Sequence, residues 1–465
     1  MKNTKHGLVK NLKRLDTLAL SFGAMIGWSW VALATGIIGR GGSVGGLVAT
    51  LIVGVVILAI GFIYAELTAA MPDVGGEHVY SMRALGGTGA FVCTWSIVFV
   101  YVAVCAFEAV ALPSVLTGLF EQLENVPMWQ INGASVFLDL AIIGGITSLA
   151  IAWINIRGIK LSATVQTVVV GVILLAGILL IAGIFKQGSQ QNMQPLFTNG
   201  ATGILAAMAL IPFMMTGFDV IPQAAEEIDL PPKKIGQLLV ASIVFAVLWY
   251  LMIQIGVSSL LSSDQRAATG LGVIQASYVA FGDVGKSLML IAGLAGILTS
   301  WNSFLIGGSR AIFAMAEDGM LPAFFAKLHP KYNTPCNAIW FIGILSAAAP
   351  LLGKTALVWF VDAGSFSLMI AYFLVVVSFI LLRKKEPEMA RPFKAKGGLW
   401  LGGFGLLATL GIASLYLPGM PAALIWPNEW LMVIAWFALG GLSFWLIYRP
   451  NRKRLIINQL LIHLA

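Results

Sequence analysis

Charged residues are scarce in this chain of 465 residues, where Asp, Glu, Lys and Arg together make up only 10%. Hydrophobic residues make up 59%, and the mean hydropathy is +0.91. The interior of a soluble protein of this size cannot hide so much apolar surface, and its exterior needs more charge. The composition therefore excludes a soluble globular protein and predicts that membrane lipid surrounds much of the chain.

Cysteine and histidine are also scarce, with three and four residues. The cysteines, at positions 93, 105 and 336, lie in or beside apolar runs, which argues against a disulfide framework. The histidines show no HExxH or paired-cysteine spacing, and the chain has no GxxxxGK[ST] phosphate loop. A membrane enzyme would need a nucleophile with its base, or a metal, and the sequence contains neither pattern. We predict no cofactor and no enzymatic activity.

Long apolar runs are what the sequence has in abundance. A bilayer core needs about 20 apolar residues per helix, and twelve runs approach or exceed that length. The predicted transmembrane helices, called spans 1 to 12, are residues 15–39, 44–71, 89–119, 136–156, 161–184, 203–228, 236–261, 284–314, 336–352, 356–382, 399–417 and 428–448. The sequence thus predicts an all-α polytopic membrane protein with short connections, an N-terminal tail of residues 1–14 and a C-terminal tail of residues 449–465.

Lysine and arginine gather on one side of the predicted membrane. With twelve spans, only five of the 28 basic residues fall on the side opposite the N-terminus. These five are Arg40, Lys186, Arg266, Lys286 and Lys354. Because positively charged loops stay in the cytoplasm, both termini are predicted to be cytoplasmic and the protein to lie in the cytoplasmic membrane. The net charge of +8 then reflects topology and contact with anionic lipid, and we expect no nucleic acid partner.

Two of the apolar runs contain residues that weaken a helix. Span 1 contains GAMIGWSWVA, which begins at Gly23 and includes two glycines and a serine; span 6 contains PFMMTGFDVIPQAAEEI, with two prolines, a glycine and Asp219. The two runs correspond if the chain has two five-helix repeats, residues 15–184 and 203–382, followed by two helices within 399–448. An odd number of helices inverts the second repeat in the membrane, and paired interruptions indicate a transporter's binding site.

We expect spans 1 and 6 to be unwound at mid-membrane, near residues 23–29 and 215–219. Amides freed at the start of a half-helix attract an anion such as a carboxylate, whereas carbonyls at the end of the preceding half attract a cation. A ligand with both charges, such as an amino acid, fits two breaks that face each other. Close helix packing is the alternative explanation for glycines in a single span, and the second interruption argues against it.

Six motifs occur in order along the chain. GAMIGWS in span 1 is similar to GxxIGxG, YAELTAAMPDVGGEHVY at 64–80 to the end of a second helix, and GFDVIPQAAEEI at 217–228 to a sixth-helix motif. GGSRAIFAMAEDGMLP at 307–322, HPKYNTP at 329–335 and RPFKAKGG at 391–398 complete the set. Together they resemble the amino acid–polyamine–organocation (APC) transporters, which have a LeuT-like inverted-repeat fold. The resemblance covers nearly the whole chain and implies secondary active transport of an amino acid or related amine by alternating access.

Two features depart from this family. Ser29 stands where the signature has its second glycine, and Trp28 and Trp30 flank it where small and aliphatic residues are usual, so the pocket is reshaped. Some members have a lysine in span 5 that replaces a sodium ion and accepts a proton. The corresponding position lies near Ile173, and span 5 contains no lysine. That lysine mechanism is therefore predicted to be absent.

The two breaks and the resemblance together define a predicted substrate site. We expect the substrate carboxylate on amides near Trp28 and Ser29, and an ammonium group on carbonyls of residues 213–216. Tyr101 and Trp301 are expected to close the pocket. The full set of predicted substrate-binding residues is Gly23, Ala24, Met25, Gly27, Trp28, Ser29, Tyr101, Cys105, Phe213, Thr216, Gly217 and Trp301.

Ionisable side chains inside a membrane are costly and are functional by default. Glu108 and Asp219 are the predicted proton carriers; the alternative for each is a structural hydrogen bond. A sodium ion needs several oxygens in a small cage. The candidate sodium ligands are Gly23, Ile26, Thr299 and Ser300. We favour proton coupling, with sodium coupling or substrate exchange as the alternative and a channel or non-transporting sensor of the same fold as the second.

Overall fold

The computed structural model describes residues 7–117, 120 and 123–450. Most of the predicted C-terminal tail, from residue 451, therefore lies outside the described residues. The helices are α1 (Arg14–Met25), α2 (Ser29–Ala32), α3 (Ala34–Gly41), α4 (Ser43–Ala70), α5 (Glu77–Leu116), α6 (Leu138–Ile156), α7 (Ile159–Gln187), α8 (Gly200–Met208), α9 (Ile211–Met215), α10 (Val220–Gln223), α11 (Pro232–Leu260), α12 (Ser263–Ala267), α13 (Gly272–Glu317), α14 (Cys336–Ala348), α15 (Ala356–Lys385), α16 (Gly398–Ser414) and α17 (Asn428–Ser443). The chain also forms 3₁₀ turns and, at Phe444–Tyr448, a π-helical segment.

These helices follow the predicted spans, and a polytopic helical membrane protein is confirmed in that coarse form. Within the described part of the chain, ten helical stretches are long and apolar enough to cross a membrane. Two more apolar stretches, Cys336–Leu352 and Gly398–Ser414, are shorter. The all-α prediction is wrong in one detail, because strands β1 (Pro127–Ile131) and β2 (Ala134–Phe137) form an antiparallel hairpin between α5 and α6.

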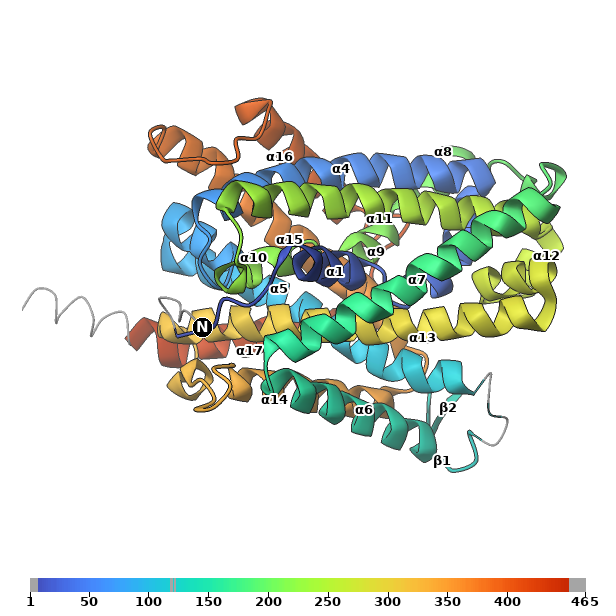
Figure 1. The fold of residues 1–465 in the computed structure, drawn as a ribbon, viewed down its shortest axis with the longest axis horizontal. Coiled ribbons are helices and arrows are strands. Elements are labelled where there is room, and N and C mark those ends of the chain that lie inside the picture. The colour runs from blue at the N-terminus through green and yellow to red at the C-terminus, as the bar shows by residue number, and fades with distance from the viewer. Residues whose placement is uncertain (1–6, 118–119, 121–122, 451–465) are drawn as a thin grey trace, which may run out of the picture.

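The turn of this hairpin explains why it forms. Asn132 and Gly133 have φ angles of 50° and 79°. An Asn-Gly pair adopts such positive φ angles readily and matches the twist of a two-stranded ribbon. The hairpin lies at the end of the bundle opposite the N-terminal residues (Figure 1).

Two helices are longer than the hydropathy of the sequence indicates. The predicted start of span 3 is residue 89, but α5 starts at Glu77; the predicted start of span 8 is residue 284, but α13 starts at Gly272. Each helix changes direction at a glycine near its predicted start, Gly86 with φ 71° and Gly282 with φ 63°. A short helix therefore precedes each span and meets it at a position that only glycine adopts without strain.

Both predicted interruptions are present as breaks in the helices. In span 1, α1 ends at Met25 and α2 begins at Ser29, so the break is shorter than the predicted residues 23–29 because Gly23 is still helical. In span 6, α9 ends at Met215 and α10 begins at Val220. A further short break separates α8 from α9.

The bundle surrounds the broken span 1. In Figure 1, α1 lies in the middle of the bundle, and it contacts α7, α11 and α13. The pair α4 and α11 runs along one edge, and the pair α6 and α14 along the opposite edge (Figure 1). The last two helices pack on this core from outside: α16 contacts α15 and α4, and α17 contacts α15 and α5.

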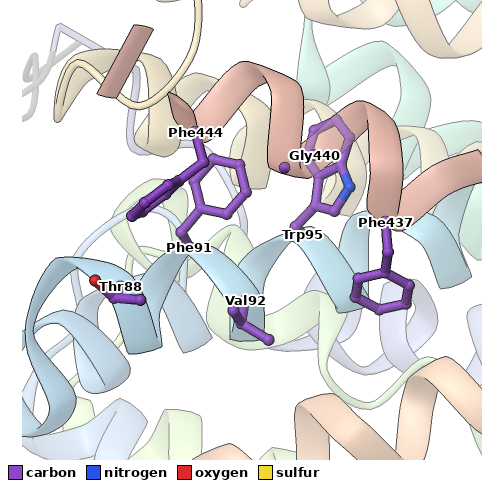
Figure 2. Close-up of a pocket in the computed structure, with 8 residues that line it drawn as sticks. Thr88, Phe91, Val92, Trp95, Phe437, Gly440 and Phe444 are labelled. Atoms are coloured by element: carbon purple, nitrogen blue, oxygen red, sulfur yellow. The ribbon is translucent and has the colours of Figure 1, made fainter. Parts of the chain in front are cut away.

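A tryptophan pair joins α17 to α5. The Trp95 and Trp436 rings stack with centroids 4.5 Å apart, and each indole N–H donates to the backbone carbonyl of the other residue, at 2.9 and 3.0 Å. A Cβ on Gly440 would collide with the Trp95 ring, so glycine is needed for this approach. Beside the pair, an apolar hollow of about 210 Å³ opens between Phe91, Phe437 and their neighbours (Figure 2).

Buried ion pairs tie the helices together at the end where the N-terminal residues lie. Glu66 of α4, only 1% exposed, accepts hydrogen bonds from Arg383 of α15 and from the amide of Ala395, and it is ion-paired with Arg391 at 3.0 Å. Arg310 of α13 pairs with Glu227 at 2.8 Å, and both side chains are nearly inaccessible. These contacts connect segments far apart in the sequence.

Replacing Glu66 by Gln should destabilise the fold by about 3 kcal/mol, because two largely buried guanidinium groups lose their carboxylate. The matched control is Glu386→Gln, which breaks the exposed pair with Arg83 and should have little effect. Thermal unfolding of both variants in the same detergent measures the difference. Equal shifts of the unfolding midpoint would contradict a structural role for the Glu66 pairs.

Candidate functional site

The break in span 1 is occupied by an acidic side chain from α5. The Trp28 amide donates a hydrogen bond to Oε1 of Glu108 at 3.3 Å. A Cβ on Gly27 would collide with the same carboxyl group and with the Ser300 hydroxyl, so glycine lets both polar groups reach the backbone. Glu108 is 1% exposed, and its Oε2 has no hydrogen-bond partner among the described residues. The amide predicted to receive a substrate carboxylate therefore holds a carboxyl group of the protein itself.

Glycines of α13 let the unwound segment pack closely. The Trp28 ring lies directly against Gly293, where any side chain would collide with it. A Cβ on Gly296 would come within 2.9 Å of the carbonyl oxygens of Ile26 and Gly27. The break is thus pressed against span 8, and its carbonyls point towards that helix.

A single tyrosine hydroxyl connects the two breaks. The hydroxyl oxygen of Tyr250, on α11, lies 2.5 Å from the carbonyl oxygen of Met25 and 2.8 Å from that of Met214. It also lies 3.2 Å from the Ser29 hydroxyl. Because a phenol has one proton, it donates to one of the two carbonyls at a time and can accept from Ser29. The ends of α1 and α9, which lack helical partners for their carbonyls, share this donor.

The two breaks also touch directly. Gly217 has φ 132°, a conformation that residues with a side chain rarely adopt, and a Cβ there would lie 2.7 Å from the Cβ of Ala24 and 2.8 Å from the Met25 amide nitrogen. The hydroxyl of Thr216 donates to the carbonyl of Pro212 at 2.9 Å, so it is already engaged within its own turn. The structure therefore brings the span 1 and span 6 residues of the predicted site together.

The remaining predicted residues lie on α5, α9 and α13 beside the breaks. The Cys105 thiol donates to the carbonyl of Trp301 at 3.8 Å, and Phe213 makes an edge contact with Phe107, with ring centroids 5.4 Å apart. The Tyr101 ring lies against Gly307 of α13. All of the predicted substrate-binding residues are buried, so the site is closed in this structure.

The two predicted proton carriers lie in different surroundings. Glu108 faces the span 1 break, whereas Asp219 follows the span 6 break and accepts a hydrogen bond from the Tyr372 hydroxyl of α15 at 2.9 Å. The other carboxylate oxygen of Asp219 has no partner among the described residues, and the side chain is fully buried. The structure therefore does not bring the two acids into one cluster.

A glutamine lies beside the candidate sodium ligands. The side-chain nitrogen of Gln166, on α7, is 3.3 Å from the carbonyl oxygen of Ala19, 3.1 Å from that of Thr299 and 2.9 Å from the Ser303 hydroxyl. A Cβ on Gly23 would collide with this nitrogen. The Thr299 hydroxyl itself donates to the carbonyl of Gly296, at 3.0 Å. The side-chain amide of Gln166, which carries no charge, thus lies among carbonyl and hydroxyl oxygens of spans 1 and 8.

Sequence reasoning missed both Tyr250 and Gln166. The signal for Gln166 was present, since it is a polar residue near the start of an otherwise apolar span 5. The sequence contains no such signal for Tyr250, because a tyrosine in VLWYLMIQIG cannot be distinguished from any other aromatic residue in an apolar helix. Its role depends on the approach of α11 to both breaks.

Replacing Tyr250 by Phe should cost about 2 kcal/mol of unfolding free energy, because two buried carbonyl groups lose their shared donor. Tyr278→Phe is the control, since that tyrosine is 43% exposed and should tolerate the loss of its hydroxyl. Thermal unfolding in detergent measures both. If Tyr250→Phe unfolds at the wild-type temperature, the hydroxyl does not hold the breaks together.

Comparison with known proteins shows which family this chain belongs to. The amino acid permease family model matches residues 12–439. The chain is 28% identical over 469 residues to the branched-chain amino acid permease BcaP of Bacillus subtilis (strain 168), covering 97% of this chain and 96% of that protein. It is 24% identical over 470 residues to the methylthioribose transporter of the same organism, covering 97% and 95%.

A plant protein is similar over a shorter part of its length. The vacuolar cationic amino acid transporter 4 of Arabidopsis thaliana is 28% identical over 411 residues, which cover 82% of this chain and 65% of that protein. All three relatives are transporters and not enzymes. Because the family model spans nearly the whole chain and the motifs agree with it, this integral membrane protein belongs to the amino acid permease family of the APC superfamily.

Proposed function

We propose that this permease carries an amino acid across the cytoplasmic membrane by proton-coupled, alternating-access transport. The observation that carries the proposal is the carboxyl group of Glu108 on the Trp28 amide, at the break in span 1. An amide that binds one carboxylate can bind another, and the backbone of a broken helix is a common anion site in transporters. The carboxylate of an amino acid would take the place that Glu108 now holds.

This competition couples substrate to protons. Two carboxylates on one amide in a buried site would repel each other strongly. When Glu108 takes up a proton, it becomes a weaker acceptor and loses its charge, so the Trp28 amide becomes free for the substrate. Protonation of Glu108 therefore favours substrate binding, and by thermodynamic linkage bound substrate favours protonation.

The side chains around the breaks favour an apolar amino acid. Trp28, Phe213 and Trp301 are buried there together with Phe107. Burial of an apolar substrate side chain against such residues is favourable. This composition agrees with the branched-chain amino acid permease among the relatives better than with the cationic amino acid transporters.

The surroundings of Gln166 argue against a cation between the carbonyls of Ala19 and Thr299. A sodium ion needs several oxygens that are free to coordinate it. Here the amide nitrogen of Gln166 occupies the space between the carbonyls of Ala19 and Thr299, so a cation gains little by entering between them. The candidate sodium ligands are other atoms, namely the carbonyls of Gly23 and Ile26 and the hydroxyls of Thr299 and Ser300.

We infer that the fold has twelve membrane helices in two inverted repeats, residues 15–184 and 203–382, followed by two helices, with both termini cytoplasmic. The breaks recur in the first helix of each repeat. The third helix of each repeat, α5 and α13, is entered through a short helix and a positive-φ glycine. Two matching pairs of irregularities support an internal repeat.

Uptake into liposomes with separately imposed pH and sodium gradients tests the proposal. We expect branched-chain amino acids to accumulate when the pH gradient alone is imposed. Glu108→Gln should lose this accumulation but retain exchange of internal for external substrate, because glutamine can still accept from the Trp28 amide and cannot carry a proton.

Three results would contradict the proposal in different ways. Accumulation driven by sodium alone, retained in Glu108→Gln and lost in Thr299→Val, would establish sodium coupling. Current that does not saturate with substrate would indicate a channel. Binding of amino acids with no movement across the membrane would indicate a sensor.

A further inference from the structure

A second pair of buried acids lies away from Glu108, at the N-terminal end of α5. Glu77 is the first residue of α5, Asp219 directly precedes α10, and both side chains are fully buried. The two carboxyl groups interact electrostatically. The turn before α5 packs tightly on α10, because a Cβ on Gly76 would lie 2.7 Å from Pro222. Glycine at this position brings the two acidic segments together.

Gln223 connects the two acids. Its side-chain amide donates to Oε2 of Glu77. Gln223 also follows Asp219 by four residues, a spacing that places both on the same side of a helical turn. The hydroxyl of Tyr372 donates to the other acid, Asp219, at 2.9 Å. Each carboxyl group thus receives one hydrogen bond from a neutral donor.

Several oxygens around the pair make no well-aligned hydrogen bond among the described residues, and all belong to buried side chains. They are Glu77 Oε1, Asp219 Oδ1, Gln223 Oε1, and the hydroxyl oxygens of Tyr64 and Tyr101. The Tyr64 hydroxyl lies close to Glu77, and the Tyr101 hydroxyl lies close to Asp219 and Gln223. Buried polar atoms without partners are rare and call for an unseen ligand or proton. Even if both hydroxyls turned to donate, they could not serve all of the carboxyl and amide oxygens. The cluster therefore has more hydrogen-bond acceptors than donors. A further hydrogen-bond donor or a cation would satisfy the remaining acceptor oxygen.

The groups that face the pair supply no positive charge. They are Tyr64 from α4, Tyr80, Cys93 and Tyr101 from α5, and Tyr372 from α15. His78, which follows Glu77 in the sequence, is engaged with Thr94 and Asp318, and Arg310 of α13 is engaged with Glu227. In the described part of the chain, no Lys, Arg or His forms an ion pair with Glu77 or Asp219.

We propose that Glu77 and Asp219 hold one proton between them and form a second proton site, separate from Glu108. Two ionised carboxylates with no counter-charge would repel each other strongly in a dry interior, and burial alone already penalises each charge. One proton removes this repulsion and supplies an O–H donor to the surplus acceptors. A proton also fits a closed cluster in which neutral donors already approach both carboxyl groups.

The position of the site indicates what the proton does. Glu77 belongs to the segment before span 3, whereas Asp219 and Gln223 belong to the half of span 6 that follows its break. If that half moves during transport, the carboxyl groups separate, and a separated carboxyl group that meets water ionises. The pair then releases its proton as span 6 moves. This role in the cycle rests on the proposed proton-coupled transport, whereas the presence of the proton does not.

Infrared spectroscopy of the purified permease at neutral pH tests the proton directly. A protonated carboxyl group has a C=O stretch at higher frequency than a carboxylate. The double variant Glu77→Gln/Asp219→Asn, checked by size-exclusion chromatography for folding, should lose the intensity of one protonated carboxyl relative to the wild type. Unchanged intensity would mean that both acids are ionised and would overturn the proposal. This measurement needs no transport, so its result does not depend on the proposed function.

Transport by the single variant Glu77→Gln tests the role of the site. It should lose accumulation driven by a pH gradient and retain exchange of internal for external substrate, because Glu77 is not part of the substrate site. The matched control Glu429→Gln changes another buried acid, in the first turn of α17, and should accumulate substrate as the wild type does. Wild-type accumulation by Glu77→Gln would overturn the role. Absence of exchange in the wild type would instead refute the proposed function.

Discussion

Backbone amides and carbonyls that leave a helix inside a membrane need partners from elsewhere in the protein, because lipid offers none. In this permease the requirement is met by side chains from other helices. Glu108 accepts from the Trp28 amide, and the Tyr250 hydroxyl serves the carbonyls of Met25 and Met214. Gly217 lets the two breaks touch. The centre of the bundle is therefore held by polar contacts, and in the proposed mechanism a substrate carboxylate replaces one of them.

The side chains that make such contacts differ in whether they can gain or lose a proton. The space between α1, α7 and α13 is filled by the amide of Gln166, which is neutral at any pH and has its donors engaged. The acids are different, because Glu108 and Asp219 each retain an oxygen without a partner among the described residues. The acids can therefore take up a proton, whereas the Gln166 amide cannot.

Much of the fold could be predicted from the sequence, because hydropathy and helix-weakening residues act locally. The apolar runs predicted the long helices, and the Gly, Ser and Pro residues within two of these runs predicted both breaks. The β-hairpin was missed although its turn, Asn132–Gly133, has a recognisable sequence. The partners of the breaks could not be predicted, since Glu108 lies 80 residues from Trp28 and Tyr250 lies 225 residues from Met25. Such pairs depend on how the helices pack, which one sequence does not specify.

The central claim is that Glu108 and the substrate carboxylate use the same backbone amide. A structure of the permease with a bound branched-chain amino acid tests it most directly. We expect the substrate carboxylate to lie within hydrogen-bond distance of the Trp28 nitrogen and the Glu108 side chain to have withdrawn from it. A bound amino acid elsewhere, with Glu108 still on the Trp28 amide, would contradict a shared amide.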